Sequence, residues 1–152
     1  MTTAQNLATI DLLRVRAFPA QRGRADVGRG AGITCTAGPG YHLAFLRTGE
    51  DLPADESIPG VEAAEQSEAE CEALAAVLDT RWGVSQMFSL WSLAVRLSDG
   101  EEVAEPWREL CCTTPYLHLW RVAERWIALG VARWEGEPSC RLIVAITVND
   151  PP

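Results

Sequence analysis

Three apolar runs near the C-terminus limit most strongly what this chain can fold into. They span residues 116–122, 126–134 and 140–148, and each is rich in aromatic, aliphatic and β-branched side chains. Runs of this length and composition are typical of buried strands. The breaks between them are short and polar or contain Gly and Pro, as expected where a chain reverses. The sequence therefore predicts an antiparallel meander of three strands.

The middle run has two different faces, because successive side chains of a strand point to opposite sides of the sheet. One face carries Trp126, Ala128, Gly130, Ala132 and Trp134. The other face is formed by Ile127, Leu129, Val131 and Arg133. The small residues of the first face leave room for another element to approach closely, and a helix of the same chain is the simplest candidate.

The best candidate for that helix covers residues 68–81. Ser67 and Glu70 have the S-x-x-E spacing of a capping box, and Gly83 follows at the position where a left-handed cap is common. The apolar residues between these ends recur on one helical face: Cys71, Leu74, Ala75, Leu78 and Trp82. We therefore expect an α+β fold with a mostly antiparallel sheet, in which the C-terminal three-strand meander packs against one principal helix at about 68–81.

The rest of the chain gives weaker signals. Residues 7–18 fit either a helical face or an alternating strand, and the approach to Pro19 favours a strand. Strands are also expected at 33–36 and 41–46, with a turn between them, and over the long alternating segment 86–97. Pro106 predicts one short turn of helix.

The length of 152 residues favours a single domain, 1–152, that can bury a core without stabilisation by disulfides or metal ions. Residues of about 20–32 are rich in Gly and Arg, which predicts a mobile loop. Residues of about 48–66 are acidic and contain Pro, which predicts a solvated connection with a short helical start near 61–66.

Charge narrows the kind of partner. The formal net charge is −8 and the chain contains no Lys, which argues against a nucleic-acid surface and suits a basic protein partner.

The N-terminus has no charged segment followed by an apolar one, and no apolar run reaches the length of a membrane span, so a cytoplasmic location is expected. The five cysteines show no disulfide framework or metal-ligand spacing, so reduced structural thiols are expected, without a metal or cofactor.

Two sets of residues are candidates for a functional site. For partner binding, Glu62, Glu65 and Glu68 would steer a basic protein, and Trp107 and Trp134 would anchor it because their polar surroundings suggest exposure. For a pocket between sheet and helix, His118, Tyr116 and a thiol of Cys111 or Cys112 form the best available constellation. The glycine-rich segment 28–32 lacks the Lys and the following helix of a phosphate-binding loop.

The segments Arg81-Trp82-Gly83, Trp120-Arg121-Val122 and 125–131 resemble those of small uncharacterised actinobacterial proteins, some of which resemble immunity proteins of toxin systems. The resemblance covers roughly residues 67–148 and implies a binding domain that occludes a toxin, with no catalytic residue to transfer. The W-R-x-x-x-R-W hairpin is also similar to the later strands of nuclear-transport-factor-2-like cones. The sequence thus favours a non-enzymatic protein-binding domain, with a small ligand-binding or catalytic cone as the alternative.

Overall fold

The computed structural model describes residues 3–21, 23–26, 34–46, 60–133 and 140–151. These residues form four helices and seven strands. The helices are α1 (Thr3–Val15), α2 (Gly60–Trp82), α3 (Trp91–Ser98) and α4 (Trp107–Thr113). The strands are β1 (Gly23–Asp26), β2 (Thr34–Gly38), β3 (Tyr41–Leu46), β4 (Gln86–Ser89), β5 (Tyr116–Val122), β6 (Arg125–Arg133) and β7 (Cys140–Thr147).

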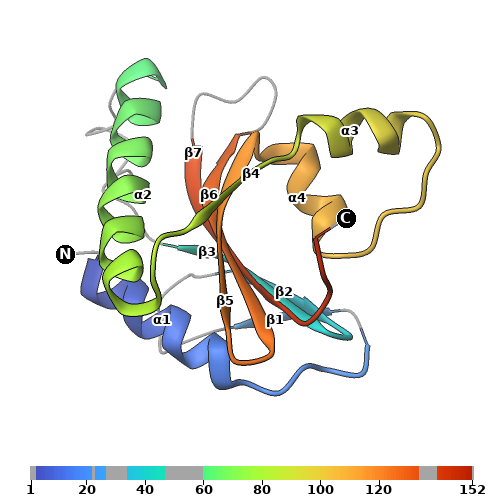
Figure 1. The fold of residues 1–152 in the computed structure, drawn as a ribbon, viewed down its shortest axis with the longest axis horizontal. Coiled ribbons are helices and arrows are strands. Elements are labelled where there is room, and N and C mark those ends of the chain that lie inside the picture. Colours follow the sequence, from blue (N-terminus) through green and yellow to red (C-terminus); the bar gives the residue numbers. More distant parts are fainter. Residues whose placement is uncertain (1–2, 22, 27–33, 47–59, 134–139, 152) are drawn as a thin grey trace.

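All seven strands belong to one antiparallel sheet with the order β1-β2-β3-β7-β6-β5-β4 (Figure 1). The expected C-terminal meander is confirmed, since β6 pairs with both β5 and β7. The hairpin of β2 and β3 joins the meander through β3 and β7. At the opposite end of the order, β4 pairs with β5 and forms an edge of the sheet.

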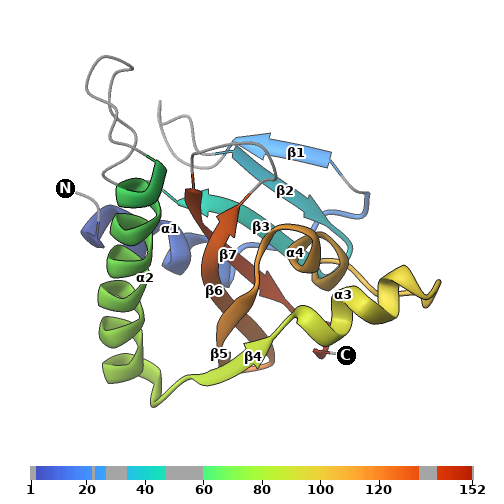
Figure 2. The ribbon, with the colours of Figure 1, turned by 90° about the horizontal axis from the view of Figure 1, so that it is seen from above.

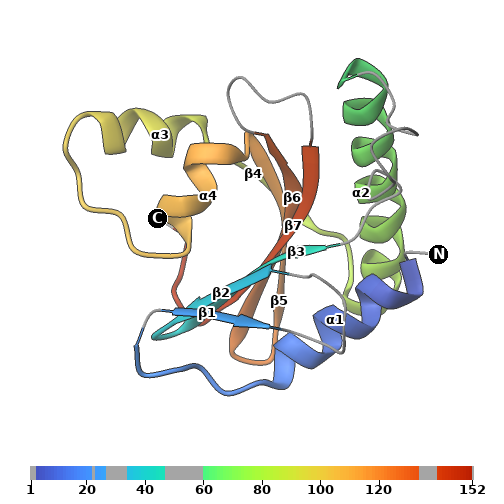
Figure 3. The ribbon, with the colours of Figure 1, turned by 180° about the vertical axis from the view of Figure 1, so that it is seen from behind.

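The sheet is the middle of three layers, with α1 and α2 on one face and α3 and α4 on the other (Figures 2 and 3). The buried side chains accordingly form two clusters. The first joins the two N-terminal helices to residues such as Ile127, Leu129 and Val144 of the sheet. The second joins α3 and α4 to residues such as Ala128, Ala132 and Ile143. The α+β class is therefore confirmed, and both faces of the sheet are covered.

The principal helix α2 lies on the aliphatic face of β6, so the prediction that it packs on the small-residue face is wrong. That face contacts α4 instead. Leu74 and Leu78 of α2 pack with Ile127 and Leu129. The opposite face of β6 meets the end of α4, where a Cβ atom at Gly130 would lie 2.9 Å from the Thr114 Cγ2 atom. The small residues of that face leave room for α4 and its connection to β5.

The N-terminal segment is a helix, so of the two structures that residues 7–18 fit, the favoured strand is wrong and the helix is the one observed. Ile10 and Leu13 are completely buried and Leu7 packs against the same cluster, as helical spacing requires. Val15, which alternation would have placed inside, is 71% exposed. The helical spacing of Leu7, Ile10 and Leu13 therefore predicts the structure correctly, and the alternation near Pro19 does not.

The long strand expected over 86–97 is also wrong beyond Ser89. Leu90 and Leu93 are buried while Trp91 is exposed, which is the pattern of the amphipathic helix α3. The backbone N–H of Trp91 donates to the Ser89 hydroxyl oxygen at 3.4 Å, at the point where strand changes to helix. Residues 90–97 have apolar side chains at both helical and strand spacing, so the sequence alone does not separate a helix from a strand there.

Helix α2 contains the predicted segment 68–81 but begins at Gly60, so the capping box at Ser67 is wrong. Ser67 is completely buried in the interior of the helix. The predicted end is correct, because Gly83 has φ = +93° and its N–H donates to the Asp79 carbonyl at 2.8 Å. The acidic connection expected over 48–66 is helical from residue 60 and otherwise lies outside the described residues.

The loop expected over residues 20–32 differs from the structure at 23–26, which form β1 and pair with β2. Residue 22 and residues 27–32 of that loop lie outside the described residues. The short helical turn expected at Pro106 is confirmed as α4, with Pro106 immediately before its first residue.

Candidate functional site

Large apolar side chains are exposed along the edge formed by β4. Eight such side chains of the described residues are exposed, and five of them lie on β4, its flanks or the adjacent end of β5. We call these five the β4 edge strip: Val84, Met87, Trp91, Val95 and Tyr116. Trp91 is 73% exposed and Met87 is 56% exposed. Several exposed apolar side chains along one edge of a sheet make that edge a candidate interaction site.

The position of the strip follows from the local folding of residues 83–91. Gly83 ends α2, and the side chain of Val84 directly after it is exposed. In β4, Met87 lies opposite His118 and Ser89 lies opposite Tyr116. The chain then turns into α3 at Trp91, whose side chain stays outside while Leu93 enters the core.

Hydrogen bonds fix the strip at both ends. The Asp79 Oδ1 atom accepts from the Ser85 backbone N–H at 2.9 Å and from the Trp120 indole N–H at 3.0 Å. At the far end, the Leu90 N–H donates to the Pro115 carbonyl at 3.0 Å. The exposed apolar side chains therefore project from an ordered backbone.

A row of carboxylates on α2 runs beside the strip. Glu65, Glu68 and Glu72 are spaced i, i+3 and i+7, so they share one helical face, which we call the acidic stripe. The Glu72 Oε1 atom lies 3.4 Å from the His118 Nε2 atom, and the Glu72 side chain is 64% exposed. Because His118 is the cross-strand neighbour of Met87, this contact places the acidic stripe next to the β4 edge strip.

The residues predicted for partner binding are only partly brought together. Glu65 and Glu68 lie on the acidic stripe, and the side chain of Glu62 lies outside the described residues, as does Trp134. The expectation that Trp107 is at the surface is wrong: its side chain is completely buried and its indole N–H donates to the Asn149 carbonyl at 3.2 Å. The polar neighbours of Trp107 in sequence lie on the outer side of α4, while Trp107 and Leu110 point inward.

Sequence reasoning missed Met87, Trp91 and Glu72. The sequence predicts one long alternating strand that contains Trp91 and Met87, and one face of such a strand is ordinarily buried. The change to helix after Ser89 is what exposes Trp91. The contact of Glu72 with His118 depends on the tertiary structure, so the sequence gives no sign of it.

The alternative constellation does not assemble. Tyr116 and His118 have ring centroids 6.4 Å apart, on the α2 side of the sheet. Cys111 and Cys112 lie on α4, on the other side, and both thiols donate to the Arg108 carbonyl. Burial and the neighbouring Cys112 raise the pKa of Cys111 to about 11, which is opposite to the shift that activates a thiol.

His118 has polar neighbours other than a thiol. Its Nδ1 atom lies 3.1 Å from the Ser85 hydroxyl, and the Glu72 carboxylate lies beyond Nε2. Both ring nitrogens thus face groups that join β5 to α2 and to the start of β4, and the ring is stacked on Trp120 at 6.0 Å. The space between α2 and the sheet is occupied by buried apolar side chains, as expected for structural packing.

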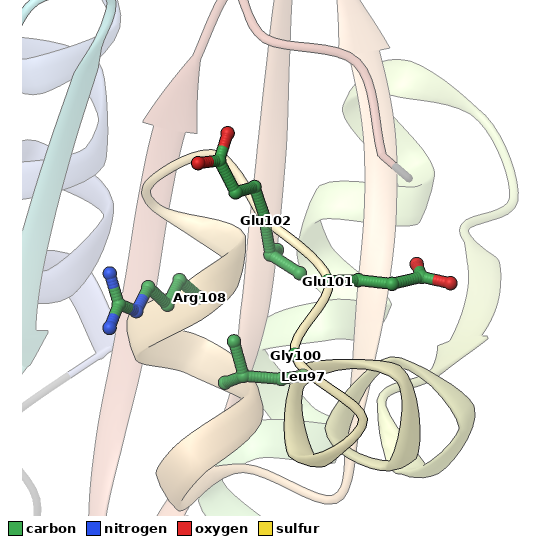
Figure 4. Close-up of a pocket in the computed structure, with 6 residues that line it drawn as sticks. Leu97, Gly100, Glu101, Glu102 and Arg108 are labelled. Atoms are coloured by element: carbon green, nitrogen blue, oxygen red, sulfur yellow. The ribbon is translucent and has the colours of Figure 1, made fainter.

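A hollow of about 400 Å³ lies where α3, the following connection and α4 meet (Figure 4). It is lined by Leu97, Gly100, Glu101, Glu102, Val103 and Arg108. The charged ends of the two glutamates and Arg108 point away from one another (Figure 4). Glu101 is already paired with Arg96 at 2.7 Å. The hollow therefore lacks the convergent polar groups that orient a small ligand.

No cluster of three His, Cys, Asp or Glu side chains suited to a metal ion occurs in the part of the chain that the structure describes. None of the described helices combines the length and apolarity needed to cross a membrane. The fold and the exposed surfaces thus define an α+β domain with an apolar edge beside an acidic helix. No protein-family model, curated protein or solved structure matches this chain.

A buried histidine on the same face as α2 should make stability depend on pH. His42 is 1% exposed, its Nε2–H faces the Arg16 carbonyl at 3.3 Å, and its Nδ1 atom has no hydrogen-bond partner among the described residues. Burial lowers the pKa of His42 below its ordinary value of 6.5. The unfolded chain therefore takes up a proton at a pH where the folded chain does not.

We expect the free energy of unfolding to decrease as the pH falls below 6.5, until the lower folded pKa is reached, by at most about 1.4 kcal/mol per pH unit. Urea denaturation at pH 7.5, 6.5 and 5.5 measures this change. His42→Gln keeps a donor for the Arg16 carbonyl and should flatten the dependence. A slope that is unchanged in H42Q would contradict the assignment of the pH dependence to His42.

Proposed function

We propose that the protein is a non-enzymatic protein-binding domain that acts as an immunity-type inhibitor of a basic protein. The observation that carries the proposal is the β4 edge strip, in which Trp91 and Met87 are held exposed on an ordered backbone. Trp is enriched among the residues that contribute most to binding, and Met adapts to irregular apolar surfaces.

The acidic stripe supports the proposal that the partner is basic. Glu65 and Glu72 are exposed on α2, and the formal net charge of the chain is −8. A negative surface of this kind accelerates association with positively charged proteins and repels negatively charged ones. The mechanism would be occlusion: carboxylates orient the basic partner and the apolar strip then covers part of its functional surface.

The charge can be tested on the partner retained by affinity capture of the tagged protein from its own host. We expect a basic protein that is released by salt. Reversing the stripe with Glu65→Lys and Glu72→Lys should lower the association rate at low ionic strength by about tenfold, and the difference should shrink at high salt because the charges are screened. Stopped-flow or surface-based kinetics measures both rates.

A matched control changes the net charge by the same amount elsewhere. Glu102 and Glu124 are exposed and lie on the α3–α4 connection and the β5–β6 turn. Glu102→Lys with Glu124→Lys should slow association much less than the stripe variant does. Equal rates for the two variants would show that net charge alone matters, and unchanged rates for both would contradict electrostatic steering.

A further inference from the structure

We infer that the partner contributes an extended segment that pairs with β4 as an additional strand, with basic and apolar side chains in alternation. This inference rests on the proposed function and specifies the binding mode and the chemistry of the segment. Strand addition uses the backbone of a sheet edge for affinity and the alternating side-chain positions for specificity.

The edge itself is suited to pairing. Within the described part of the chain, β4 ends the strand order and has β5 as its hydrogen-bonded neighbour on one side (Figure 2). Its sequence, Gln86-Met87-Phe88-Ser89, contains no Pro and no charged residue. Charged residues and Pro are two of the features by which sheet edges avoid pairing, and a third is a short strand, which β4 has with its four residues.

The edge is also ordered before the partner arrives. The Ser85 N–H is held by Asp79 just before β4, and the Leu90 N–H is held by Pro115 just after it. Binding to a fixed strand avoids the entropy cost of ordering a flexible one. Four residues give a short pairing, so the exposed side chains around the edge must supply part of the affinity.

The surroundings of the two faces of β4 favour different side chains on the added strand. On the α2 side, Met87 stands next to His118, whose Nε2 atom is 3.4 Å from the Glu72 carboxylate. A Lys or Arg of the added strand on this side would approach the acidic stripe. On the other side, Phe88 is half-buried with its ring centroid 6.1 Å from that of Trp107, which favours an apolar neighbour. The pattern expected of the segment is therefore alternating.

A second copy of this chain suits the edge poorly. Two copies paired through β4 would bring two acidic stripes together, each on a chain of net charge −8. Like charges placed opposite one another oppose association. The charge of the surroundings thus favours a basic segment of a different protein.

The test uses random twelve-residue peptides displayed on phage and selected on the full chain. We expect the selected peptides to alternate Lys or Arg with apolar residues. A synthetic copy of the best peptide should slow hydrogen–deuterium exchange of amides in residues 86–89. Alternate N–H groups of an antiparallel strand point to opposite sides, so only one of the two sets in the peptide would face β4. Methylating that set of amides should abolish binding, and methylating the other set should not.

Two exposed apolar residues supply matched variants. Trp91→Ala should weaken peptide binding at least tenfold, a size common for central aromatic anchors. Leu12→Ala should leave it unchanged, since Leu12 is 47% exposed on α1 and outside the strip. Both variants should fold, because neither side chain belongs to the buried core.

Several outcomes would overturn the inference. These are protection that maps to α2 or elsewhere instead of β4, equal effects of both methylated sets, a dimer of the chain that requires β4, or a selection that enriches no peptide. The charge-reversal kinetics with the captured partner still decides the proposed function in each case. Steering by the acidic stripe without protection of β4 would retain the binding domain and remove strand addition.

Discussion

Replacing Trp107 with alanine is expected to lower the free energy of unfolding by about 3–5 kcal/mol, in the range measured for deletion of large buried aromatic side chains. Trp107 is completely buried between α4 and the sheet. Its ring packs edge-on against Phe88, and its indole N–H donates to the Asn149 carbonyl at 3.2 Å. The substitution removes apolar contacts, leaves a cavity and deprives the C-terminal segment of a hydrogen bond.

Urea denaturation followed by circular dichroism measures this change, because far-ultraviolet ellipticity does not depend on which indole is removed. Trp91→Ala is the matched control: it deletes the same side chain from a position that is 73% exposed. We expect the control to lose less than about 1 kcal/mol, as is usual for surface substitutions. Similar losses in both variants would contradict the assigned burial of Trp107.

The contrast between these two tryptophans shows where sequence reasoning stops. Trp107 follows Pro106 in a polar stretch and was expected at the surface, whereas Trp91 sits among apolar residues and is exposed. In both cases the local composition describes the average surroundings of the chain. Burial depends on whether the residue lies on the side of its short helix that faces the sheet, and only the tertiary structure shows which side that is.

The elements that were predicted correctly are those fixed by local chemistry. The meander follows from three apolar runs with short breaks, and the end of α2 follows from the left-handed conformation at Gly83. The segments predicted wrongly, 7–18 and 90–97, have apolar residues at both helical and strand spacing. Only the packing of α1 and α3 against the two faces of the sheet separates the two structures.

The candidate site was predictable to the same limited extent. The acidic character of α2 is visible in the sequence, including Glu65 and Glu68. The β4 edge strip is not visible, because it depends on a strand of four residues that lies at the sheet edge and gives way to a helix. The contact of Glu72 with His118, which joins the acidic stripe to that edge, connects residues from different elements.

Gly130→Ala is expected to destabilise the protein by up to about 3 kcal/mol, the upper part of the range for an added methyl group in a packed core. A Cβ atom at this position would lie 2.9 Å from the Leu117 Cδ2 atom, the Thr114 Cγ2 atom and the Tyr116 carbonyl oxygen. Side chains could rotate away, but the Tyr116 oxygen belongs to the backbone at the start of β5. Relief therefore requires β5 or the end of α4 to move.

The matched control is Gly23→Ala, because a Cβ atom at Gly23 meets nothing within 4 Å. Thermal or urea unfolding should show a loss for G130A and little change for G23A. Since Tyr116 belongs to the β4 edge strip and begins the strand that pairs with β4, a shift of its backbone should also disturb the binding edge. G130A should then bind the selected peptide more weakly, even at temperatures where it is fully folded. If G130A loses stability but keeps its affinity for the peptide, a shift at the α4–β5 junction does not reach the β4 edge.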